Sequence, residues 1–289
     1  VKSYSRYPSW FNHPMYKKYR QPENLRYPYW LQPEKHYVGA AWYQKQIDIP
    51  ADWNGQTVKL ILERCHWKSD VWIDGFKVGM NDSLMTAHVY DVTDFMDSGK
   101  CTLTVRIDNS MIYNVGYNSH IVSDHTQSAW NGIIGQIALK AEPKVWIEDV
   151  QVFPNVSEKT ANVKLEICNR TDKDIEVELK LSAESYNGEI KHVPEDFNTT
   201  VTLRGEKSVV DVTYPMGNEV QLWDEFSPTL YRLGGSVSVK GSGKKAYKQA
   251  CFGMREVGVK DTRITLNNKE IFLRGIEECA IFPNTGYPA

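Results

Sequence analysis

The sequence predicts an all-β protein in which two β-sandwiches follow one another along the chain. Short stretches of alternating apolar and polar residues recur about every 10 to 15 residues from position 37 onward, with turn-forming residues between them. No stretch of 12 residues shows the 3.6-residue apolar period of an amphipathic helix. The length of 289 residues exceeds that of one ordinary small domain. These observations favour two sandwiches over an α/β fold.

Residues 1–36 precede the regular strand pattern and are expected to form an irregular arm. Prolines interrupt this segment repeatedly, and its many aromatic side chains follow no period. We expect these aromatic side chains to pack on the domain that follows. In an alternative interpretation, Trp10, Tyr29 or Trp30 helps to line a sugar site, because aromatic rings stack on the C–H faces of sugars.

The first sandwich, a jelly roll, is expected over residues 1–143. Asp74-Gly75 lies between two alternating stretches and is a strong signal for a two-residue hairpin turn. The strand signals of this domain lie at 40–50, 57–65, 69–80, 88–96, 101–109 and 133–143. A long polar loop, residues 109–132, separates the last two strands. Loops of this length inside a compact domain are uncommon and usually functional.

The second sandwich is expected over residues 144–255, with an immunoglobulin-like fold. About seven short strands with turns between them fit such a fold, although the cysteine pair and tryptophan spacing of antibody domains are missing. The clearest strand signals lie at 144–156, 161–169, 175–185, 197–205, 208–216 and 234–241.

Residues 256–289 read as the start of a further domain. Ile264-Thr265-Leu266 alternates, Asn267-Asn268 predicts a tight turn, and Ile271-Phe272-Leu273 is expected to return as a strand. The following apolar stretch FLRGIEECAIF would expose its side chains in a free-standing module. We therefore expect a truncated domain here.

Composition narrows the classes of partner and cofactor. The formal net charge of −2 and the pI near 6.4 imply no basic face for nucleic acid. No apolar run approaches the ~18 residues that a membrane span requires. The five scattered cysteines have no zinc-binding spacing, so we expect no metal and no cofactor. We expect them to be mostly buried free thiols, and the sequence does not decide whether Cys65 and Cys101 form a disulfide.

Several motifs together resemble glycoside hydrolase family 2, which includes β-galactosidases, β-glucuronidases and β-mannosidases. The resemblance covers nearly the whole chain, and the order and spacing of the motifs make it specific. The motifs are AAWYQKQIDIP at 40–50, VWIDGFKVG at 71–79, WNGIIGQIAL at 130–139, VWIEDVQVFPNV at 145–156, LWDEFSPTLYRL at 222–233, FGMRE at 252–256 and FLRG at 272–275. The resemblance implies a sugar-binding-type jelly roll, an immunoglobulin-like sandwich and the start of a (β/α)8 barrel, whose first strand would be about Ile271–Gly275.

The resemblance also implies where the chemistry would lie. Retaining glycosidases use two carboxylates about 5 Å apart, and in this family both are glutamates on later strands of the barrel. Glu277 and Glu278 match no catalytic motif, and neighbouring residues on a strand point to opposite faces. No catalytic residue is therefore assigned, and the chain alone is expected to be inactive.

The polar loop is the candidate substrate-binding element. In the family, a loop of the first domain reaches the sugar at the mouth of the barrel, and SDHTQSAWNG matches it by position. Carboxylate, imidazole and amide groups beside an indole form the mixture that a sugar site needs. The candidate residues are Asp124, His125, Gln127, Trp130 and Asn131. Gly135-Gln136 replaces an arginine that some family members carry, so the resemblance does not determine which sugar is preferred. The competing interpretation is a loop that only stabilises itself by side-chain-to-backbone bonds.

Three interpretations of function remain. The first is the non-catalytic N-terminal portion of an exo-acting, β-galactosidase-like enzyme whose partner is a β-linked glycoside. The second is a stand-alone carbohydrate-binding or surface-adhesion protein, and the third is a structural immunoglobulin-like protein without a ligand. Family members often form dimers or tetramers, so a homo-oligomer is one expected partner. A periplasmic or extracellular location is favoured over a cytoplasmic one. A turn at Asn81–Ser83, with His88, is a lesser candidate for binding a sugar or a cation.

Overall fold

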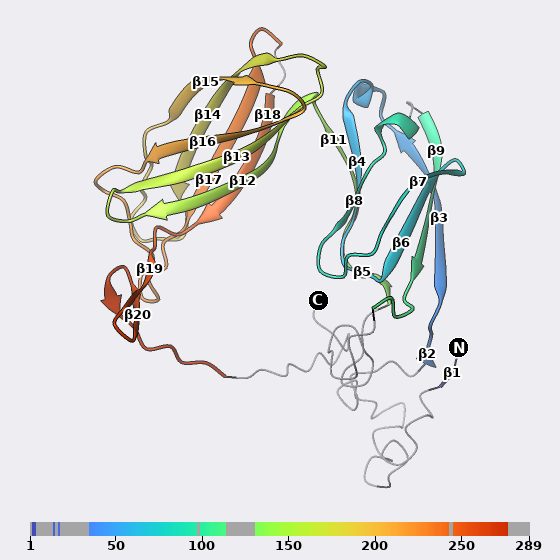
Figure 1. Cartoon of the computed structure of the whole chain (residues 1–289), viewed down its shortest axis with the longest axis horizontal. Helices are drawn as coiled ribbons and strands as arrows, with labels where there is room; N and C mark the ends of the chain where they lie inside the picture. Colours follow the sequence, from blue (N-terminus) through green and yellow to red (C-terminus); the bar gives the residue numbers. More distant parts are fainter. Residues whose placement is uncertain are drawn as a thin grey trace. The chain divides into compact units, whose positions relative to one another are not determined.

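A computed structural model of the chain describes residues 2–3, 14, 17, 35–96, 99–113, 131–242 and 245–276. Regular structure in these residues is β, apart from 3-10 turns, which include η4 (Ala51–Trp53), η5 (Thr93–Phe95) and the singly described residues Pro14 and Lys17. The all-β prediction is therefore confirmed. The chain divides into two compact units, residues 1–141 with 276–289, and residues 142–275 (Figure 1).

The first unit contains a four-stranded sheet in the order β3-β9-β6-β7 and a three-stranded sheet in the order β11-β4-β8. Two short pairs, β1-β2 and β10-β5, complete its described strands. The strands are β1 (Lys2–Ser3), β2 (Lys35–His36), β3 (Ala40–Ile49), β4 (Thr57–Leu62), β5 (Cys65–His66), β6 (Lys68–Ile73), β7 (Phe76–Asn81), β8 (His88–Asp91), β9 (Gly99–Asp108), β10 (Gly132–Ile133) and β11 (Ile137–Glu142).

Alternation along β9 shows how this unit forms its core. Cys101, Leu103, Val105 and Ile107 point inward and are buried, while the residues between them are only partly covered. They pack with apolar residues of β4, β6 and β8 in one cluster, so side chains from both sheets share a core. Burying a side chain of this size contributes roughly 1.5–3 kcal/mol to stability. The period of two thus produces a sandwich.

Two turns of this unit lie at Asp74-Gly75 and after β8. The predicted hairpin turn is confirmed: Asp74 and Gly75 both have positive φ, 48° and 87°, as a type I′ turn requires. The strand expected over 88–96 is shorter, because β8 ends at Asp91. The Asp91 carboxylate accepts hydrogen bonds from the backbone N–H and the hydroxyl of Thr93, at 3.1 and 2.6 Å. These local bonds turn the chain into η5.

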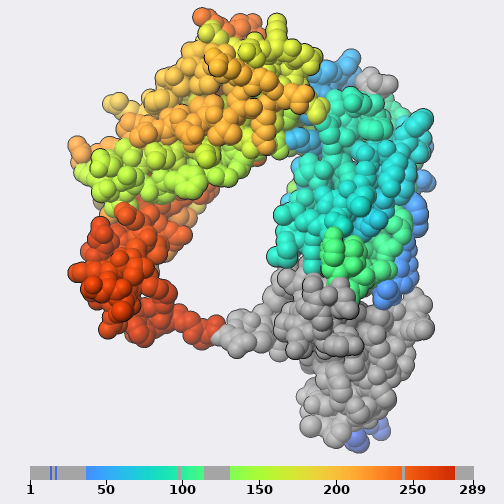
Figure 2. Space-filling view, in the orientation of Figure 1, coloured from blue at the N-terminus to red at the C-terminus, as the bar shows by residue number. Residues whose placement is uncertain are grey.

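Residues 145–252 of the second unit form seven strands in two antiparallel sheets, in agreement with the predicted β-sandwich, although the strand at 245–252 was not located from the sequence. Their orders are β12-β13-β16 and β15-β14-β17-β18, and both sheets contribute to one buried apolar cluster. Figure 2 shows these strands filling a continuous surface from yellow-green to orange. The strands are β12 (Val145–Asn155), β13 (Thr160–Asn169), β14 (Ile175–Ser185), β15 (Phe197–Leu203), β16 (Lys207–Pro215), β17 (Tyr231–Val239) and β18 (Lys245–Phe252).

A small sheet follows the seven strands, formed by β19 (Val257–Lys260), β20 (Arg263–Leu266) and β21 (Lys269–Glu270). The predicted turn between β20 and β21 is confirmed, since Asn267 and Asn268 have φ values of 50° and 64°. Asn267 also donates its side-chain N–H to the carbonyl of Trp223 at 3.0 Å. This bond fastens the turn to the segment that precedes β17.

The strand expected at Ile271–Gly275 is not present. Residues 271–276 carry no regular structure, and Phe272 and Leu273 are 79% and 65% exposed. The N–H of Ile271 still donates to the carbonyl of Ile264 at 3.0 Å. A strand needs a neighbour for its backbone groups, and the sheet order gives residues 272–276 none within the described part of the chain. The return of the hairpin is only the two residues of β21.

The four described cysteines are free, so the Cys65–Cys101 disulfide is not formed. Cys65 and Cys101 are buried in the core of the first unit, and Cys168 is half-buried. Cys251 is exposed, contrary to the expectation of mostly buried thiols, because it lies at an outward position of β18. Burial raises the pKa of the Cys65 thiol to about 12, which leaves it unreactive at neutral pH.

Candidate functional site

Asn131 is the candidate binding residue that the structure describes. Asp124, His125, Gln127 and Trp130 lie outside the described residues, and so do Glu277 and Glu278. The structure therefore describes the two ends of the polar loop, residues 109–113 and 131–132. Those two ends can be built up from their contacts.

Asn109, at the start of the loop, closes its base. The side-chain N–H groups of Asn109 donate hydrogen bonds to Oδ1 of Asn131 and to the carbonyl of Tyr37, the latter at 2.7 Å. The Oδ1 of Asn109 accepts the backbone N–H of Gly39 at 2.7 Å. One amide thus ties the start of the loop to its end and to the segment leading into β3. Sequence reasoning missed Asn109, since nothing in its neighbourhood marks it apart from its place at the end of a strand.

Gly132 carries the chain out of the loop along a path that other residues would not tolerate. Its φ of 75° lies in the left-handed region, and a Cβ there would meet the hydroxyl of Tyr43. Gly132 then pairs with His66 in the β10-β5 ladder. The exit of the loop is therefore fixed against β3 and β5.

Tyr113, the last described residue on the entry side of the loop, is held by Asp82 and by Trp67. Its hydroxyl donates to the Asp82 carboxylate at 3.0 Å, and this bond raises the pKa of the Tyr113 phenol. Its ring meets that of Trp67 edge to face, with centroids 5.8 Å apart. Because Trp67 directly follows His66, the entry and the exit of the loop contact neighbouring residues.

The turn after β7 is a structural element rather than a binding turn. Asn81 Oδ1 accepts the backbone N–H of Ser83 at 2.9 Å, and the carbonyl of Asp82 accepts the Trp67 indole N–H at 2.8 Å. The fully buried His88 ring hydrogen-bonds Ser69 Oγ through Nδ1 and the carbonyl of Ser83 through Nε2. These polar groups are used in holding the turn, so the lesser candidate is not supported.

The Ser69–His88 pair does not form a nucleophile and base of the hydrolase type. A carbonyl accepts from Nε2, so Nδ1 is the unprotonated nitrogen and accepts the Ser69 hydroxyl proton. The hydroxyl of Tyr90 lies 2.6 Å from Ser69 Oγ and completes a closed network. Ser69 is fully buried, so substrate has no route to its oxygen.

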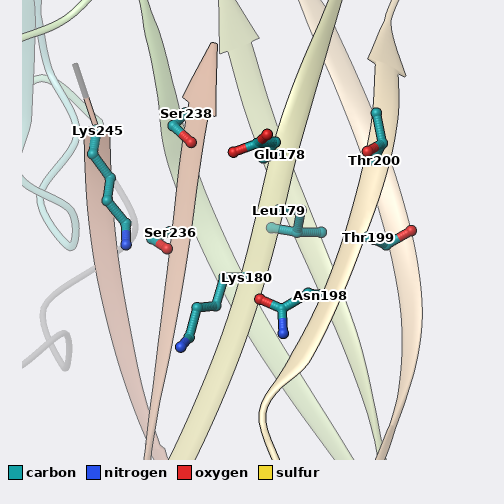
Figure 3. A pocket seen from close by; sticks show the side chains of 9 residues that line it. All are labelled: Glu178, Leu179, Lys180, Asn198, Thr199, Thr200, Ser236, Ser238 and Lys245. Atoms are coloured by element: carbon teal, nitrogen blue, oxygen red, sulfur yellow. The ribbon is translucent and has the colours of Figure 1, made fainter. Parts of the chain in front are cut away.

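A shallow groove of about 380 Å³ lies on the outer face of the second unit. Its lining residues lie on β14, β15, β17 and β18, and Figure 3 shows their side chains spread apart rather than pointing toward a common centre. Hydroxyl, amide and charged groups alternate with inward residues such as Leu179, which is 1% exposed. We read this surface as the solvated face of the sheet. Its lining residues are Glu178, Leu179, Lys180, Asn198, Thr199, Thr200, Ser236, Ser238 and Lys245.

The described ranges contain neither a metal-binding cluster nor a membrane-spanning helix. No group of three or more His, Cys, Asp or Glu side chains in those ranges is arranged to hold a metal ion. No helix in those ranges has the length and hydropathy needed to cross a membrane.

Sequence comparisons match two domain descriptions to consecutive parts of the chain. Residues 5–143 match "Glycosyl hydrolases family 2, sugar binding domain", and residues 145–255 match "Glycosyl hydrolases family 2". A β-galactosidase large subunit from Latilactobacillus sakei is 24% identical over 255 residues, covering 88% of this chain and 38% of that relative. A β-galactosidase from Photobacterium profundum is 24% identical over 273 residues, covering 91% of this chain and 25% of that relative.

Solved structures share the fold. The β-glucuronidase of Bacteroides uniformis superposes with a TM-score of 0.70 at 21% identity, covering 83% of this chain and 29% of that one. A glycosyl hydrolase family 2 member from Bacteroides cellulosilyticus gives a TM-score of 0.67 at 21% identity, covering 82% and 32%. The chain therefore spans well under half the length of these relatives.

Proposed function

Since the chain belongs to glycosyl hydrolase family 2, we propose that it forms the non-catalytic N-terminal portion of an exo-acting, retaining β-glycosidase of the β-galactosidase type. The proposed domains are a sugar-binding-type jelly roll at 1–143, an immunoglobulin-like sandwich at 144–255, and the beginning of a catalytic barrel at 256–289. The order of the two matched domains supports this assignment.

The observation that carries the proposal is the closed base of the polar loop. Asn109 bonds Asn131, and the loop's two ends contact the neighbouring residues His66 and Trp67. A long loop fixed at its base can present side chains at a constant position while its tip adapts to a ligand. We propose that this loop forms one wall of the sugar site.

The proposed roles follow from the chemistry of each side chain. The carboxylate of Asp124 accepts hydrogen bonds from neighbouring sugar hydroxyls, and the Trp130 indole stacks on the sugar ring. His125, Gln127 and Asn131 donate and accept further bonds. Oδ1 of Asn131 already accepts from Asn109, which leaves the side-chain NH2 of Asn131 to contact the ligand.

The catalytic carboxylates are proposed to come from a barrel domain. A retaining mechanism needs an acid/base and a nucleophile about 5 Å apart, and no residue of this chain is assigned either role. The partner of the whole protein is proposed to be a β-linked glycoside, with a homo-oligomer as a further expectation. A stand-alone adhesion protein is less well supported, because two consecutive family 2 domains match in the order found in enzymes of that family.

The test is turnover of aryl β-glycosides by the purified chain. We expect no hydrolysis of the galactoside, glucuronide, mannoside or glucoside, while saturation-transfer NMR detects contact with one of the corresponding monosaccharides. Replacing Trp130 by Ala should abolish that contact, whereas replacing the exposed Phe153 of the second unit by Ala should leave it unchanged. Hydrolysis by this chain alone would show that the catalytic carboxylates lie within it.

A further inference from the structure

The outer face of the β3-β9-β6-β7 sheet carries Trp42 and Trp72, which have no role in the proposed loop site. The ladder pairs Trp42 with Arg106 and Trp72 with Thr104, and both partners lie between inward-pointing residues of β9. Directly opposed residues of an antiparallel pair share a face, so both indoles lie on the side away from the core. The sheet is seen in blue and green in Figure 1.

The two indoles stack on each other across the middle strand. Their ring centroids are 5.3 Å apart and their planes differ by 29°. Trp42 remains 61% exposed, and the ammonium of Lys77 lies 5.6 Å from the centroid of Trp72. The result is a fixed aromatic surface facing solvent, with a cation at one end. Aromatic side chains of this size usually cover apolar area, so an exposed Trp42 held on a half-buried Trp72 is unusual.

Ion pairs beside the indoles hold the polar groups of this face in place. The Asp70 carboxylate, 7% exposed, accepts from Lys77 at 2.9 Å and from Arg106 at 3.0 Å. Arg106 also bonds Asp108 at 2.5 Å. Burial raises the pKa of Asp70, but the bonds from Lys77 and Arg106 outweigh it, so the pKa of Asp70 lies below its usual value. Asp70 therefore stays ionised at neutral pH between the side chains of Lys77 and Arg106.

The mixture of groups on this face indicates what it can bind. The outer face of the sheet also carries Gln44, whose side-chain N–H donates to the Thr104 hydroxyl at 3.0 Å. The charged groups just described lie on the same face. The buried centre of a protein interface is depleted in charged residues, whereas this face mixes charge and aromatic rings in adjacent rows. A pyranose ring presents an apolar C–H face and a rim of hydroxyls, which matches an indole surface with polar neighbours.

We propose that Trp42 and Trp72 form a carbohydrate-binding platform on the outer face of this sheet, where a pyranose unit of a glycan chain stacks on Trp42 and its hydroxyls contact Gln44 and Lys77. The platform lies on regular strands, so it is preorganised. It involves none of the residues predicted for the loop. Its ligand is a glycan, and the binding needs no catalytic group.

The experiment titrates the full 289-residue chain with cellohexaose, xylohexaose and β-1,4-galactohexaose. Calorimetry gives the association constant, and the indole N–H resonances of Trp42 and Trp72 in ¹H–¹⁵N spectra locate the contact. We expect one hexasaccharide to bind and to shift both resonances. Trp42→Ala should lower the association constant about tenfold or more, equivalent to about 1.4 kcal/mol. Trp42→Phe should retain part of the binding, because it keeps an aromatic face.

The matched control is Phe76→Ala, which removes another exposed aromatic ring of the same sheet, 71% exposed and paired with the inward Ile73. It should leave binding unchanged. Trp130→Ala should leave the two indole shifts intact, which separates the platform from the loop and from the proposed function. The proposal is overturned if no hexasaccharide binds the wild-type chain, or if Trp42→Ala binds as tightly as wild type. It is also overturned if Trp42→Ala instead abolishes self-association in sedimentation, since the face would then contact a second copy.

Discussion

The side-chain amide of Asn109 donates a hydrogen bond to the side-chain carbonyl of Asn131, so the residues at the two ends of the polar loop are joined directly. The same amide bonds Tyr37 and Gly39, which places the clamp at the entry to β3. A loop closed in this way costs less to order around a ligand, because its ends are already together.

Asn109→Ala should loosen the base of the loop. We expect a loss of roughly 2–3 kcal/mol in local stability, because the substitution removes three hydrogen bonds with a net value of about 1 kcal/mol each. Chymotrypsin cleavage after Tyr117 should become correspondingly faster. Asn162→Ala, which removes an exposed amide in the second unit, is the control and should leave the cleavage rate unchanged. Equal cleavage rates in wild type and Asn109→Ala would contradict the clamp.

Ser69→Ala should strongly destabilise the protein, although it removes only one hydroxyl group. The substitution leaves the buried Nδ1 of His88 without its partner, which costs about 1–3 kcal/mol, while the Tyr90 hydroxyl keeps its bond to the Ser69 carbonyl at 3.2 Å. Ser83→Ala removes an exposed hydroxyl bonded to Thr86 and should change stability by less than about 0.5 kcal/mol. Urea unfolding of both variants measures the difference. Similar midpoints would mean that the buried network contributes little.

Stability should fall on mild acidification because of His88. Burial lowers the pKa of the His88 imidazole, although the Ser83 carbonyl and Asp82 oppose this effect. In the unfolded chain the imidazole gains a proton below its ordinary pKa of about 6.5, whereas in the folded chain it resists protonation. The unfolded state therefore binds more protons, and stability decreases as the pH falls from about 6.5 toward the lower folded value. His88→Gln should flatten this part of the profile, leaving the contribution of His192, whose pKa burial also lowers.

Two substitutions in the β20-β21 turn should have opposite effects. Asn268→Gly should be neutral or stabilising, because Asn-Gly is the favoured pair for a type I′ turn. Asn267→Ala keeps the positive φ but loses the bonds to the Trp223 carbonyl and to the backbone N–H of Glu256, so about 1–2 kcal/mol of local stability should be lost. Hydrogen exchange of β19 and β20 amides measures both. Identical exchange in the two variants would contradict the role of Asn267.

Thiol labelling should distinguish the cysteines. Iodoacetamide is expected to modify the exposed Cys251 rapidly in the native chain and to leave the buried Cys65 and Cys101 unmodified. Burial raises the pKa of Cys65 to about 12 and also raises the pKa of Cys101, so both thiols supply less thiolate than an exposed cysteine. Peptide mass mapping identifies the labelled residues. A reducing agent should not change the melting temperature, and a fall would indicate a disulfide between the two buried residues.

The sequence predicted the fold well where local chemistry decides it. Alternating residues predicted β9 and six of the seven strands of the second sandwich, and Asp74-Gly75 and Asn267-Asn268 predicted their turns, because side-chain period and positive φ are local properties. The strand β18 was not located from the sequence. The strand expected at Ile271–Gly275 is absent because pairing depends on neighbours that a local pattern does not supply.

The candidate site was predictable only in part. The length and polarity of residues 109–132 pointed to the loop, but the clamp at Asn109 depends on contacts with Tyr37 and Gly39, some seventy residues earlier. The Trp42–Trp72 stack joins strands that are separated in the sheet by β9, so their spacing in the sequence carries no signal.

The pairing of β3 with β9 has a consequence for synthesis of the chain. Strand β3 ends at Ile49 and its partner β9 begins only at Gly99, whereas β12 ends at Asn155 and its partner β13 begins at Thr160. At ribosomal rates of about 5–20 residues per second, β3 waits about 3–10 s for its partner, and β12 waits about 1 s or less. The finished sheet offers no protection in that interval, when the backbone of β3 is open to pairing with another nascent chain.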